Sequence, residues 1–408
     1  MITKLLVLSN GHGEDQIAVR IIKQLQIVTN IELVALPIVG QGYAYENNHI
    51  AIAGRVQQMP SGGFIYMGGN PLWQDVRGGL IQLTIEQIKL VRQWGKGGGA
   101  VLAVGDIVPL LYAWLSKTNY AFVGTARSEY YLRDDAGWLA QTSKIERQIG
   151  SVYMPWERWL MSRNTCKSVF PRDSLTTEIL QQRSILAYDL GNPMMDEITS
   201  DAEFNKESAD LENLNILLLA GSRMPEALRN WQQILVSISG TIEKIEQKQL
   251  KFLGAIAPAL DLKPFMAAAV TKGWRVATEE SNSCTLTQEN ATLILSQSSY
   301  AQFLQQADIA IAMAGTATEE FVGLGKPAII MPGEGPQFTY AFAEAQSRLL
   351  GCSIVMVENC DRVSQAIIEV MNNPQQIQQI ALNGKRRMGK TGAAKRIANC
   401  LVETLLKE

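Results

Sequence analysis

Residues 309–331, IAIAMAGTATEEFVGLGKPAIIM, decide the fold class of this sequence. Ile309–Met313 is a continuous apolar run, which is typical of a strand that is buried on both faces of a parallel sheet. AGTATEE follows and opens a helix, and Ala328–Met331 is a second apolar strand. Because a strand, a turn, a helix and a strand make a βαβ unit, we predict an α/β fold with parallel sheets.

The same alternation recurs along the 408 residues of the chain. In the first half it predicts strands at Lys4–Leu8, Glu32–Val39, Ala100–Val104 and Tyr120–Val123, and a helix at Leu80–Trp94. In the second half it predicts further strands at Asn215–Ala220, Lys251–Ile256 and Leu293–Ser296. Two α/β halves of about 190 and 200 residues fit the usual size of a domain. Thr199–Asn213, rich in Asp, Glu, Ser and Asn, is predicted to link them, and Arg127–Gly150 is interpreted as an insertion or lid-like segment.

The composition excludes several classes of protein. Lys and Arg number 37 against 39 Asp and Glu, and this near-neutral balance argues against nucleic acid as the main partner. The two histidines, His12 and His49, exclude a multi-histidine metal site. Five widely spaced cysteines argue against a disulfide framework or a zinc site, and we expect reduced, mostly buried thiols. The N-terminus lacks the features of a signal peptide and no apolar run approaches about 18 residues, so we expect a cytoplasmic protein.

Two loops of the first half follow predicted strands, where ligands of open α/β sheets bind. In SNGHGED, residues 9–15, Gly11 and Gly13 allow a ligand to approach the backbone, and His12 and Glu14 lie at the start of a helix. The alternative is a tight turn with a histidine cap, and the missing third glycine disfavours NAD. Asp106 directly follows the strand Ala100–Val104 and Gly105, so it is a candidate general base or, alternatively, a helix cap.

Loops of the second half carry the features of an anion site. Gly221 and Ser222 turn into a helix beside Arg223, and a helix N-terminus with a guanidinium group attracts phosphate. The small residues Gly315, Thr316 and Ala317 open another helix, and Glu319 or Glu320 one turn later could accept hydrogen bonds from ribose hydroxyls. The alternatives are an exposed surface arginine and acidic first-turn residues that complement the helix dipole. PGEGPQ, which ends at Gln337, is a further glycine-rich turn at the same edge of the sheet.

Two segments combine basic and apolar character. YMPWERWLMSR, residues 153–163, places Tyr153, Trp156 and Trp159 near Arg158 and Arg163, which suits a membrane interface. A buried core with a solvated arginine face is an equal alternative. GKRRMGKTGAAKR near the C-terminus holds basic residues and no acid between Lys385 and Arg396, which fits an exposed helical face or contact with anions.

Several motifs resemble, in order and spacing, those of lipid A disaccharide synthase: GSRMPE at 221–226, AGTATEE at 314–320 and GNPMMD at 191–196. SNGHGED and the VGD at 104–106 fit the same alignment, so the resemblance spans nearly the whole chain. RMGKTGAAKRIA near the C-terminus also resembles the end of the peptidoglycan N-acetylglucosaminyltransferases. The sequence is most similar to the subgroup called lipid A disaccharide synthase-related proteins, although the SPSVWAWR-like stretch appears only as PWERW and GEASGD only as GHGED.

This resemblance implies a GT-B fold, with two Rossmann-like domains that face a cleft. It implies an acceptor domain at 1–195, a UDP-sugar domain at 196–384, and a C-terminal helix at 385–408 that crosses back to the first domain. It implies donor binding by Gly221, Ser222, Arg223, Gly315, Thr316, Ala317, Glu320 and Gln337. Within that set, Arg223 matches a diphosphate-binding arginine and Glu320 a ribose-binding glutamate. It implies acceptor binding by Asn10, Gly11 and Gly13, and no metal or other cofactor.

The function expected from residues and resemblance together is an inverting, metal-independent glycosyltransferase with a UDP-sugar donor and a lipid-like acceptor. Asp106 is the first candidate for the base, with Glu14 and His12 as further catalytic candidates. One rival is a UDP-sugar epimerase, for which His12 and Glu14 would serve, and another is a catalytically silent nucleotide-sugar-binding protein. Peripheral contact with the inner face of the cytoplasmic membrane and a homodimer both stay open, and no nucleic acid is expected.

Overall fold

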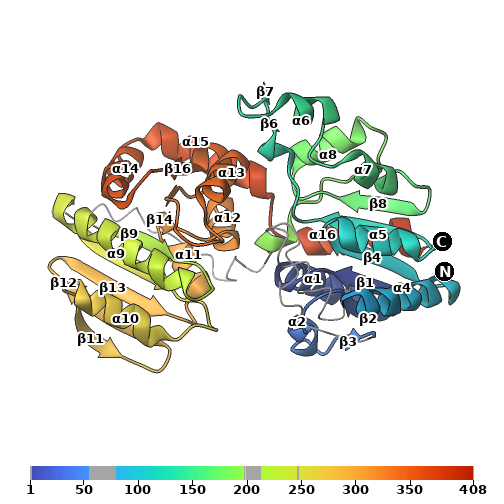
Figure 1. Cartoon of the computed structure of the whole chain (residues 1–408), viewed down its shortest axis with the longest axis horizontal. Helices are drawn as coiled ribbons and strands as arrows, with labels where there is room; N and C mark the ends of the chain where they lie inside the picture. The colour runs from blue at the N-terminus through green and yellow to red at the C-terminus, as the bar shows by residue number, and fades with distance from the viewer. Residues whose placement is uncertain (1, 55–79, 197, 199–212, 246–247, 408) are drawn as a thin grey trace. The chain divides into compact units, whose positions relative to one another are not determined.

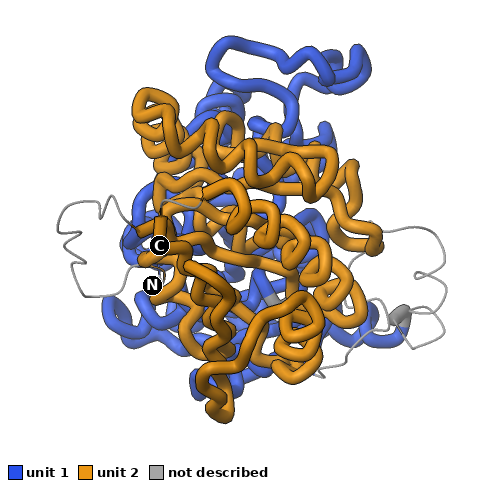
Figure 2. The backbone as a smooth tube through the Cα atoms, turned by 90° about the vertical axis from the view of Figure 1, so that its left-hand side faces the viewer, with its two compact units in different colours: residues 1–196, 389–408 blue, residues 197–388 orange. Residues whose placement is uncertain are grey.

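The computed structural model describes residues 2–54, 80–196, 198, 213–245 and 248–407 (Figure 1). Of the predicted linker, Thr199–Asn213, only Asn213 lies among these residues. The chain divides into two compact units, coloured separately in Figure 2. Unit 1 comprises Met1–Asp196 and Gly389–Glu408, and unit 2 comprises Glu197–Met388. Each unit is described by itself below.

Unit 1 contains a six-stranded sheet with the order β3-β2-β1-β4-β5-β8, in which every neighbouring pair is parallel. Its strands are β1 (Lys4–Ser9), β2 (Glu32–Pro37), β3 (Ala51–Ile52), β4 (Ala100–Gly105), β5 (Tyr120–Gly124) and β8 (Cys166–Phe170). The order reverses between β1 and β4, which is the topological switch point where open α/β sheets bind ligands.

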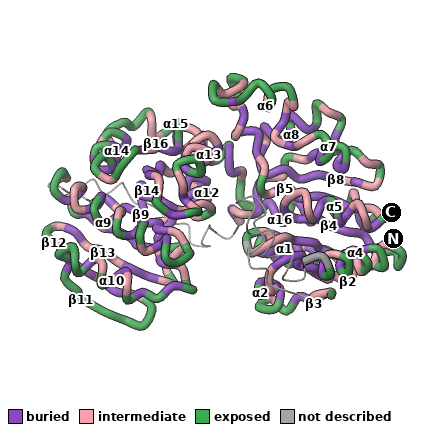
Figure 3. Tube along the Cα trace, viewed as in Figure 1, coloured by how far each residue is buried: buried purple, intermediate pink, exposed green. Residues whose placement is uncertain are grey.

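Both faces of this sheet are buried, because side chains of β1 alternate between two apolar clusters. Leu5 and Val7 belong to one cluster, and Leu6 and Leu8 belong to the other. Figure 3 shows the resulting buried centre of the unit. Its helices are α1 (His12–Val28), α2 (Tyr43–Glu46), α4 (Leu80–Lys96), α5 (Ile107–Leu115), α6 (Lys144–Ile149), α7 (Pro155–Met161), α8 (Ser174–Gln181) and α16 (Ala393–Leu401), with the 3-10 turns η1 (Glu129–Tyr131) and η2 (Pro193–Met195), the π-helical η5 (Val402–Leu406) and the hairpin β6–β7 (Arg133–Asp134, Gly137–Trp138).

The C-terminal helix α16 packs in unit 1, against α1. The GNPMMD motif forms η2, and its last residue, Asp196, caps α16. The Asp196 carboxylate accepts hydrogen bonds from the backbone nitrogens of Ala393 (2.9 Å) and Ala394 (2.7 Å). A carboxylate at this position satisfies two otherwise unpaired N–H groups of the helix N-terminus. Part of the motif's role is therefore structural, since it holds the last helix in place.

Unit 2 contains an eight-stranded sheet with the order β11-β12-β13-β10-β9-β14-β15-β16. The sheet is parallel from β13 to β16, whereas β12 runs antiparallel to both β11 and β13. Its strands are β9 (Asn213–Leu219), β10 (Gln249–Ala255), β11 (Arg275–Glu279), β12 (Ser283–Gln288), β13 (Ala291–Ser296), β14 (Ile309–Ala312), β15 (Ala328–Ile330) and β16 (Ile354–Met356). Its helices are α9 (Glu226–Lys244), α10 (Leu262–Thr271), α11 (Tyr300–Gln306), α12 (Thr316–Gly323), α13 (Tyr340–Leu350), α14 (Val363–Met371) and α15 (Pro374–Met388), with the 3-10 turns η3 (Gly351–Ser353) and η4 (Cys360–Arg362).

The structure bears on three expectations from the sequence, which concern the segment Arg127–Gly150, the cysteines and membrane-spanning helices. The segment Arg127–Gly150 is an insertion between β5 and β8 that is anchored in unit 1, because Glu129 within it is fully buried. The thiols are not mostly buried: Cys352 is exposed, although Cys166 and Cys284 are buried. None of the helices in the described ranges combines the length and the apolar character that are needed to cross a bilayer.

Candidate functional site

Two loops of unit 1 meet at the switch point. The loop after β1 holds Asn10, and Asp106 directly follows β4, the strand beside β1. The side-chain nitrogen of Asn10 lies 3.3 Å from each carboxylate oxygen of Asp106. Asn10, one of the predicted acceptor-binding residues, is thus joined to the predicted base at the carboxyl ends of neighbouring strands.

Asp106 caps helix α5. Its Oδ1 atom accepts a hydrogen bond of 2.9 Å from the backbone nitrogen of Val108, so the capping alternative is present in the structure. Burial raises the pKa of the Asp106 carboxyl, and the donors Val108 N–H and Asn10, together with the charge of Arg127, oppose that rise. A cap uses only part of a carboxylate's acceptor capacity. The catalytic role of Asp106 therefore stays a prediction that capping does not contradict.

Glu14 lies in the first turn of α1, beside the same loops. Burial raises the pKa of its carboxyl from 4.5 to about 7, and the negative charges of Asp106 and Asp15 add to the rise. The Glu14 side chain lies close to Gly105, where a Cβ atom would lie 3.0 Å from Glu14 Cγ. Gly105 also has a φ of +128°, which a side chain would strain. A carboxyl group with a pKa near neutrality can donate or accept a proton at physiological pH.

A network of buried hydroxyl groups lies near Glu14. Ser9 Oγ donates to Asp15 Oδ1 at 2.6 Å, and Ser9 Oγ lies 2.5 Å from the hydroxyl of Tyr45. Since a serine hydroxyl has a single proton, Tyr45 must donate to Ser9. Tyr45 and Ser9 are fully buried, and Asp15 is 2% exposed. Tyr45 could not be singled out from the sequence, because it follows the second strand in a helix that carries no motif.

The remaining predicted residues of this loop are placed as follows. Gly11 is the N-cap of α1, with a φ of 133°, and His12 is the first residue of the helix. The His12 side chain lies outside what the structure describes, so its catalytic role stays a prediction. Gly13 is exposed, and a Cβ atom there would meet nothing within 4 Å. Packing within the chain therefore does not require a glycine at position 13.

Three loops of unit 2 follow neighbouring strands at its own switch point, between β9 and β14. Gly221, Ser222 and Arg223 follow β9, and Gly315 follows β14. A Cβ atom at Gly221, whose φ is +97°, would lie 3.4 Å from the backbone oxygen of Met313, so the first two loops touch. Ser222 and Arg223 are exposed. The predicted donor residues of these two loops are thus brought together.

Glu226 positions the third loop. It is 5% exposed, and its carboxylate accepts hydrogen bonds from the backbone nitrogens of Gln337 (3.1 Å) and Phe338 (2.8 Å). The segment that carries Gln337 is therefore held beside the first turn of α9, three residues after Arg223. Glu226 stands within the motif GSRMPE, but no role for it could be predicted from the motif. A carboxylate that binds two backbone N–H groups of a distant loop leaves no local sequence signal.

Helix α12 begins at Thr316, and Gly315 is its N-cap. No side chain caps this N-terminus. The amide nitrogen of Gln346 instead donates to the backbone oxygens of Ala314 (3.3 Å) and Gly315 (3.0 Å), which fixes the turn from outside the helix. Backbone N–H groups at an uncapped N-terminus, together with the helix dipole, favour an anion.

Glu320, the predicted ribose-binding residue, has a partner that the sequence did not reveal. The Tyr300 hydroxyl, at the start of α11, donates to Glu320 Oε2. Glu320 is 9% exposed. One of its oxygens is therefore held by Tyr300, which fixes the direction of the carboxylate.

The described residues contain no group of three or more His, Cys, Asp or Glu side chains arranged to hold a metal ion.

No protein-family model matches the sequence, and no curated protein matches it significantly. Solved structures, in contrast, match nearly the whole chain. MnaA from S. aureus, in a co-structure with UDP, has a TM-score of 0.58 at 13% identity, over 99% of this chain and 97% of that one. The UDP-GlcNAc 2-epimerase from Neisseria meningitidis, bound to UDP-GlcNAc, has a TM-score of 0.56 at 16% identity, over 99% and 100%. MurG from Acinetobacter baumannii has a TM-score of 0.55 at 14% identity, over 98% and 99%.

The chain has the GT-B fold. The predicted fold class is therefore confirmed. Since these neighbours include both epimerases and MurG, the likeness establishes the fold and does not select lipid A disaccharide synthase among the proteins that share it.

Proposed function

We propose that this protein is a UDP-sugar-dependent enzyme, and that it transfers the sugar to a hydroxyl of a lipid-like acceptor. The observation that carries the proposal is the uncapped N-terminus of α12 at Gly315, which follows β14, the neighbour of the strand β9 that leads to Arg223. Solved structures of the same fold hold UDP and UDP-GlcNAc, which supports a uridine nucleotide as the ligand. The motifs shared with lipid A disaccharide synthase support the lipid-like acceptor.

Donor binding is assigned to unit 2. The diphosphate would accept hydrogen bonds from the first N–H groups of α12 and from the Arg223 guanidinium, which is the usual arrangement for a bound phosphate. Glu320, held by Tyr300, would accept hydrogen bonds from the ribose hydroxyls. Gln337 would reach the sugar from the loop that Glu226 holds.

Proton removal is assigned to unit 1. The acceptor oxygen would attack the anomeric carbon of the donor while the bond from that carbon to the UDP oxygen breaks, which inverts the configuration. The acceptor proton passes to a carboxylate, and the electron pair of the broken bond leaves with UDP. Arg223 and the α12 N-terminus would stabilise the negative charge on the leaving group.

Asp106 is the proposed base. It keeps two donors, Asn10 and the Val108 N–H, that stabilise the carboxylate form. Glu14, with a pKa of about 7, would carry a proton for much of the time at neutral pH. Burial raises the pKa of both carboxyl groups, and the two donors to Asp106 favour its carboxylate form, which supports Asp106 as the base.

The same pair supports an epimerase as the second candidate. Inversion at a sugar carbon needs one group to remove a proton and another to return it from the opposite face. Asp106 and Glu14, two carboxyl groups beside the same loops, are candidates for these two groups, and the pKa of Glu14 lies near neutrality. A catalytically silent UDP-sugar-binding protein is the third reading, and it requires only the features of unit 2.

Product analysis separates these functions. The full chain is incubated with single UDP-sugars, with and without a bacterial lipid extract, and Asp106→Asn serves as the matched control. A glycosyltransferase releases UDP and forms a glycolipid only with the extract, an epimerase forms a new UDP-sugar without it, and a silent binder forms neither. No binding of UDP or of any UDP-sugar by calorimetry would overturn the proposal as a whole. If a glycolipid forms, lipid profiling of a deletion strain would identify the acceptor.

A further inference from the structure

Two helices of unit 1 expose large apolar side chains. Helix α5 has the sequence IVPLLYAWL, which contains no charged residue. Leu111 on this helix is 39% exposed. On α7, Trp156 is 58% exposed and Trp159 is 45% exposed. The sequence left open whether these tryptophans are core or interface residues. The structure places Tyr153 in the core, at 1% exposure, and both tryptophans at the surface.

These side chains form one continuous surface. The rings of Trp114 on α5 and Trp159 on α7 pack edge to face, with centroids 5.5 Å apart. Leu111 lies one helical turn before Trp114, and Trp156 lies one turn before Trp159, so each pair shares a helix face. We call Leu111, Trp114, Trp156 and Trp159 the tryptophan surface.

The exposed charges of the two segments that carry the tryptophan surface, residues 107–117 and 155–163, have one sign. Arg163 places its guanidinium 4.4 Å from the ring centroid of Trp159, and Lys117 follows the end of α5. The single acid of helices α5 and α7 is Glu157, which is 1% exposed and forms an ion pair of 3.3 Å with Arg127. Residues 107–117 and 155–163 therefore offer solvent apolar and cationic groups without an exposed acid.

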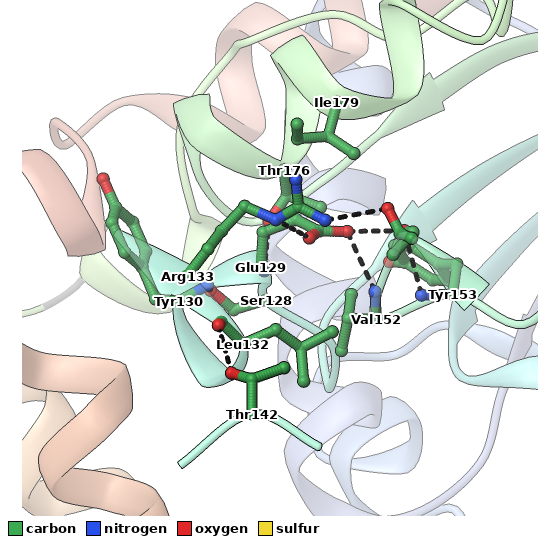
Figure 4. A network of polar contacts seen from close by, with 12 residues as sticks. Ser128, Glu129, Tyr130, Leu132, Arg133, Thr142, Val152, Tyr153, Thr176 and Ile179 are labelled. Atoms are coloured by element: carbon green, nitrogen blue, oxygen red, sulfur yellow. Dashed lines mark hydrogen bonds and ion pairs between the residues drawn. The ribbon is translucent and has the colours of Figure 1, made fainter. Parts of the chain in front are cut away.

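The tryptophan surface stands on a fixed base. Figure 4 shows the buried carboxylate of Glu129, which accepts hydrogen bonds from Ser151 Oγ (2.5 Å) and Val152 N (2.9 Å). An ion pair of 2.9 Å joins the same carboxylate to Arg133. Ser151 and Val152 lie just before α7, so this network fixes the chain that leads into the helix. The indoles are exposed on an anchored helix and not on a loose loop.

We propose that the tryptophan surface docks on a lipid bilayer that carries anionic headgroups. Tryptophan side chains favour the interfacial layer of a bilayer, where the ring is partly apolar and its N–H stays hydrated. Basic side chains beside them are attracted to anionic lipids. A second copy of this chain is a poorer occupant, because the copies of a symmetric interface would bring like charges together. The inference does not rest on the proposed reaction, since no residue of the tryptophan surface belongs to the candidate site.

Vesicle binding tests the proposal with the full chain. We expect sedimentation with vesicles of phosphatidylcholine and phosphatidylglycerol, and weaker sedimentation with phosphatidylcholine alone. Trp156→Ser with Trp159→Ser should reduce binding at least tenfold on both. Lys117→Asn with Arg163→Gln should reduce binding to the anionic vesicles by about thirtyfold and change binding to the neutral ones little, because each basic residue near an anionic surface contributes about fivefold. Asparagine is chosen for its tolerance of the positive φ of 60° at Lys117.

Leu382→Ser is the matched control, because Leu382 is 67% exposed in unit 2 and should leave binding unchanged. The far-UV circular dichroism spectrum and the thermal unfolding of all variants should match those of the wild type, which shows that they are folded. No sedimentation of the wild type would overturn the proposal, and so would binding that survives both double substitutions. A dimer in light scattering that Trp156→Ser abolishes, without any vesicle binding, would assign the tryptophan surface to a second copy instead.

Discussion

The amide group of Asn10 donates to the carboxylate of Asp106 across 96 residues of sequence, with the nitrogen 3.3 Å from both oxygens. The contact joins the loops after β1 and β4 at the point where the strand order of unit 1 reverses. Two residues that were predicted from the sequence to have different roles, acceptor binding and base, therefore form one hydrogen-bonded pair. Predictions about either must allow for the other.

Asp106→Asn should lower turnover by about 10²–10⁴-fold, the usual range for loss of a general base, while UDP affinity stays the same. The carboxamide keeps the size of the side chain and can still accept the hydrogen bond from Val108 N–H, so the helix cap survives. Steady-state kinetics and calorimetry measure the two quantities. A near-normal rate, with a large loss in Glu14→Gln, would transfer the role of base to Glu14.

Glu14 should make stability depend on pH. Its pKa is 4.5 when exposed and about 7 in the folded chain, so folding favours the protonated form. The resulting stabilisation is complete below about pH 4.5 and is lost as the pH rises through about 7, with a total on the order of 3 kcal/mol. Urea denaturation of wild type and Glu14→Gln at several pH values measures it. We expect the wild type to lose stability relative to the variant over that window, and a constant difference would contradict the assignment.

Arg223→Ala should weaken UDP binding tenfold or more, because a hydrogen bond to a charged group contributes about 1.5–3 kcal/mol. Calorimetry with UDP measures the loss directly. Arg275→Ala is a suitable control, since Arg275 is an exposed arginine of the same unit in β11. Equal UDP affinity in wild type and Arg223→Ala would remove Arg223 from the donor site.

We expect full activity in the presence of EDTA. In the proposed site the dipole of α12 and the guanidinium of Arg223 take the place of a cation at the diphosphate. The rate of UDP release, with and without the chelator, tests this expectation. A rate that EDTA abolishes and that magnesium or manganese restores would show that a metal is required.

Asp196→Ala should destabilise the protein by about 0.5–2 kcal/mol, the usual effect of losing an N-terminal cap. The substitution removes the acceptor for the N–H groups of Ala393 and Ala394. Asp196→Asn keeps one acceptor oxygen and should recover part of the loss. Chemical denaturation of the three proteins provides the comparison, and equal stability of Asp196→Ala and wild type would show that the cap contributes nothing.

The parallel strands could be predicted from the sequence because each is a short apolar run next to a turn. The run at residues 100–104 became β4, and the run at 309–313 became β14, each within one residue at its end. Strand β11 gave no such signal, since all five of its residues, RVATE, are exposed. Its pairing with β12 at the edge of the sheet creates the strand, and pairing of that kind is not visible in a local pattern.

The candidate site divides in the same way. The predicted loop residues Gly221, Gly315 and Asp106 could be found because a small or acidic residue comes shortly after a buried strand. Tyr300 and Glu226 could not, because each acts on a partner that is distant in sequence: Tyr300 on Glu320, and Glu226 on the backbone of Gln337. Such contacts arise from packing of the whole unit and leave no fixed spacing in the chain.

The capping of α16 by Asp196 also bears on the order in which the chain folds during synthesis. Ile397 and Leu401 of α16 belong to an apolar cluster of unit 1 that includes Leu5 and Val7 of β1. Unit 2, in contrast, is one continuous stretch, Glu197–Met388, that is synthesised before α16. Domains generally fold from the N-terminus onward during synthesis. Here the unit that contains the first residues cannot complete its core until the whole of the unit inserted within it has been synthesised.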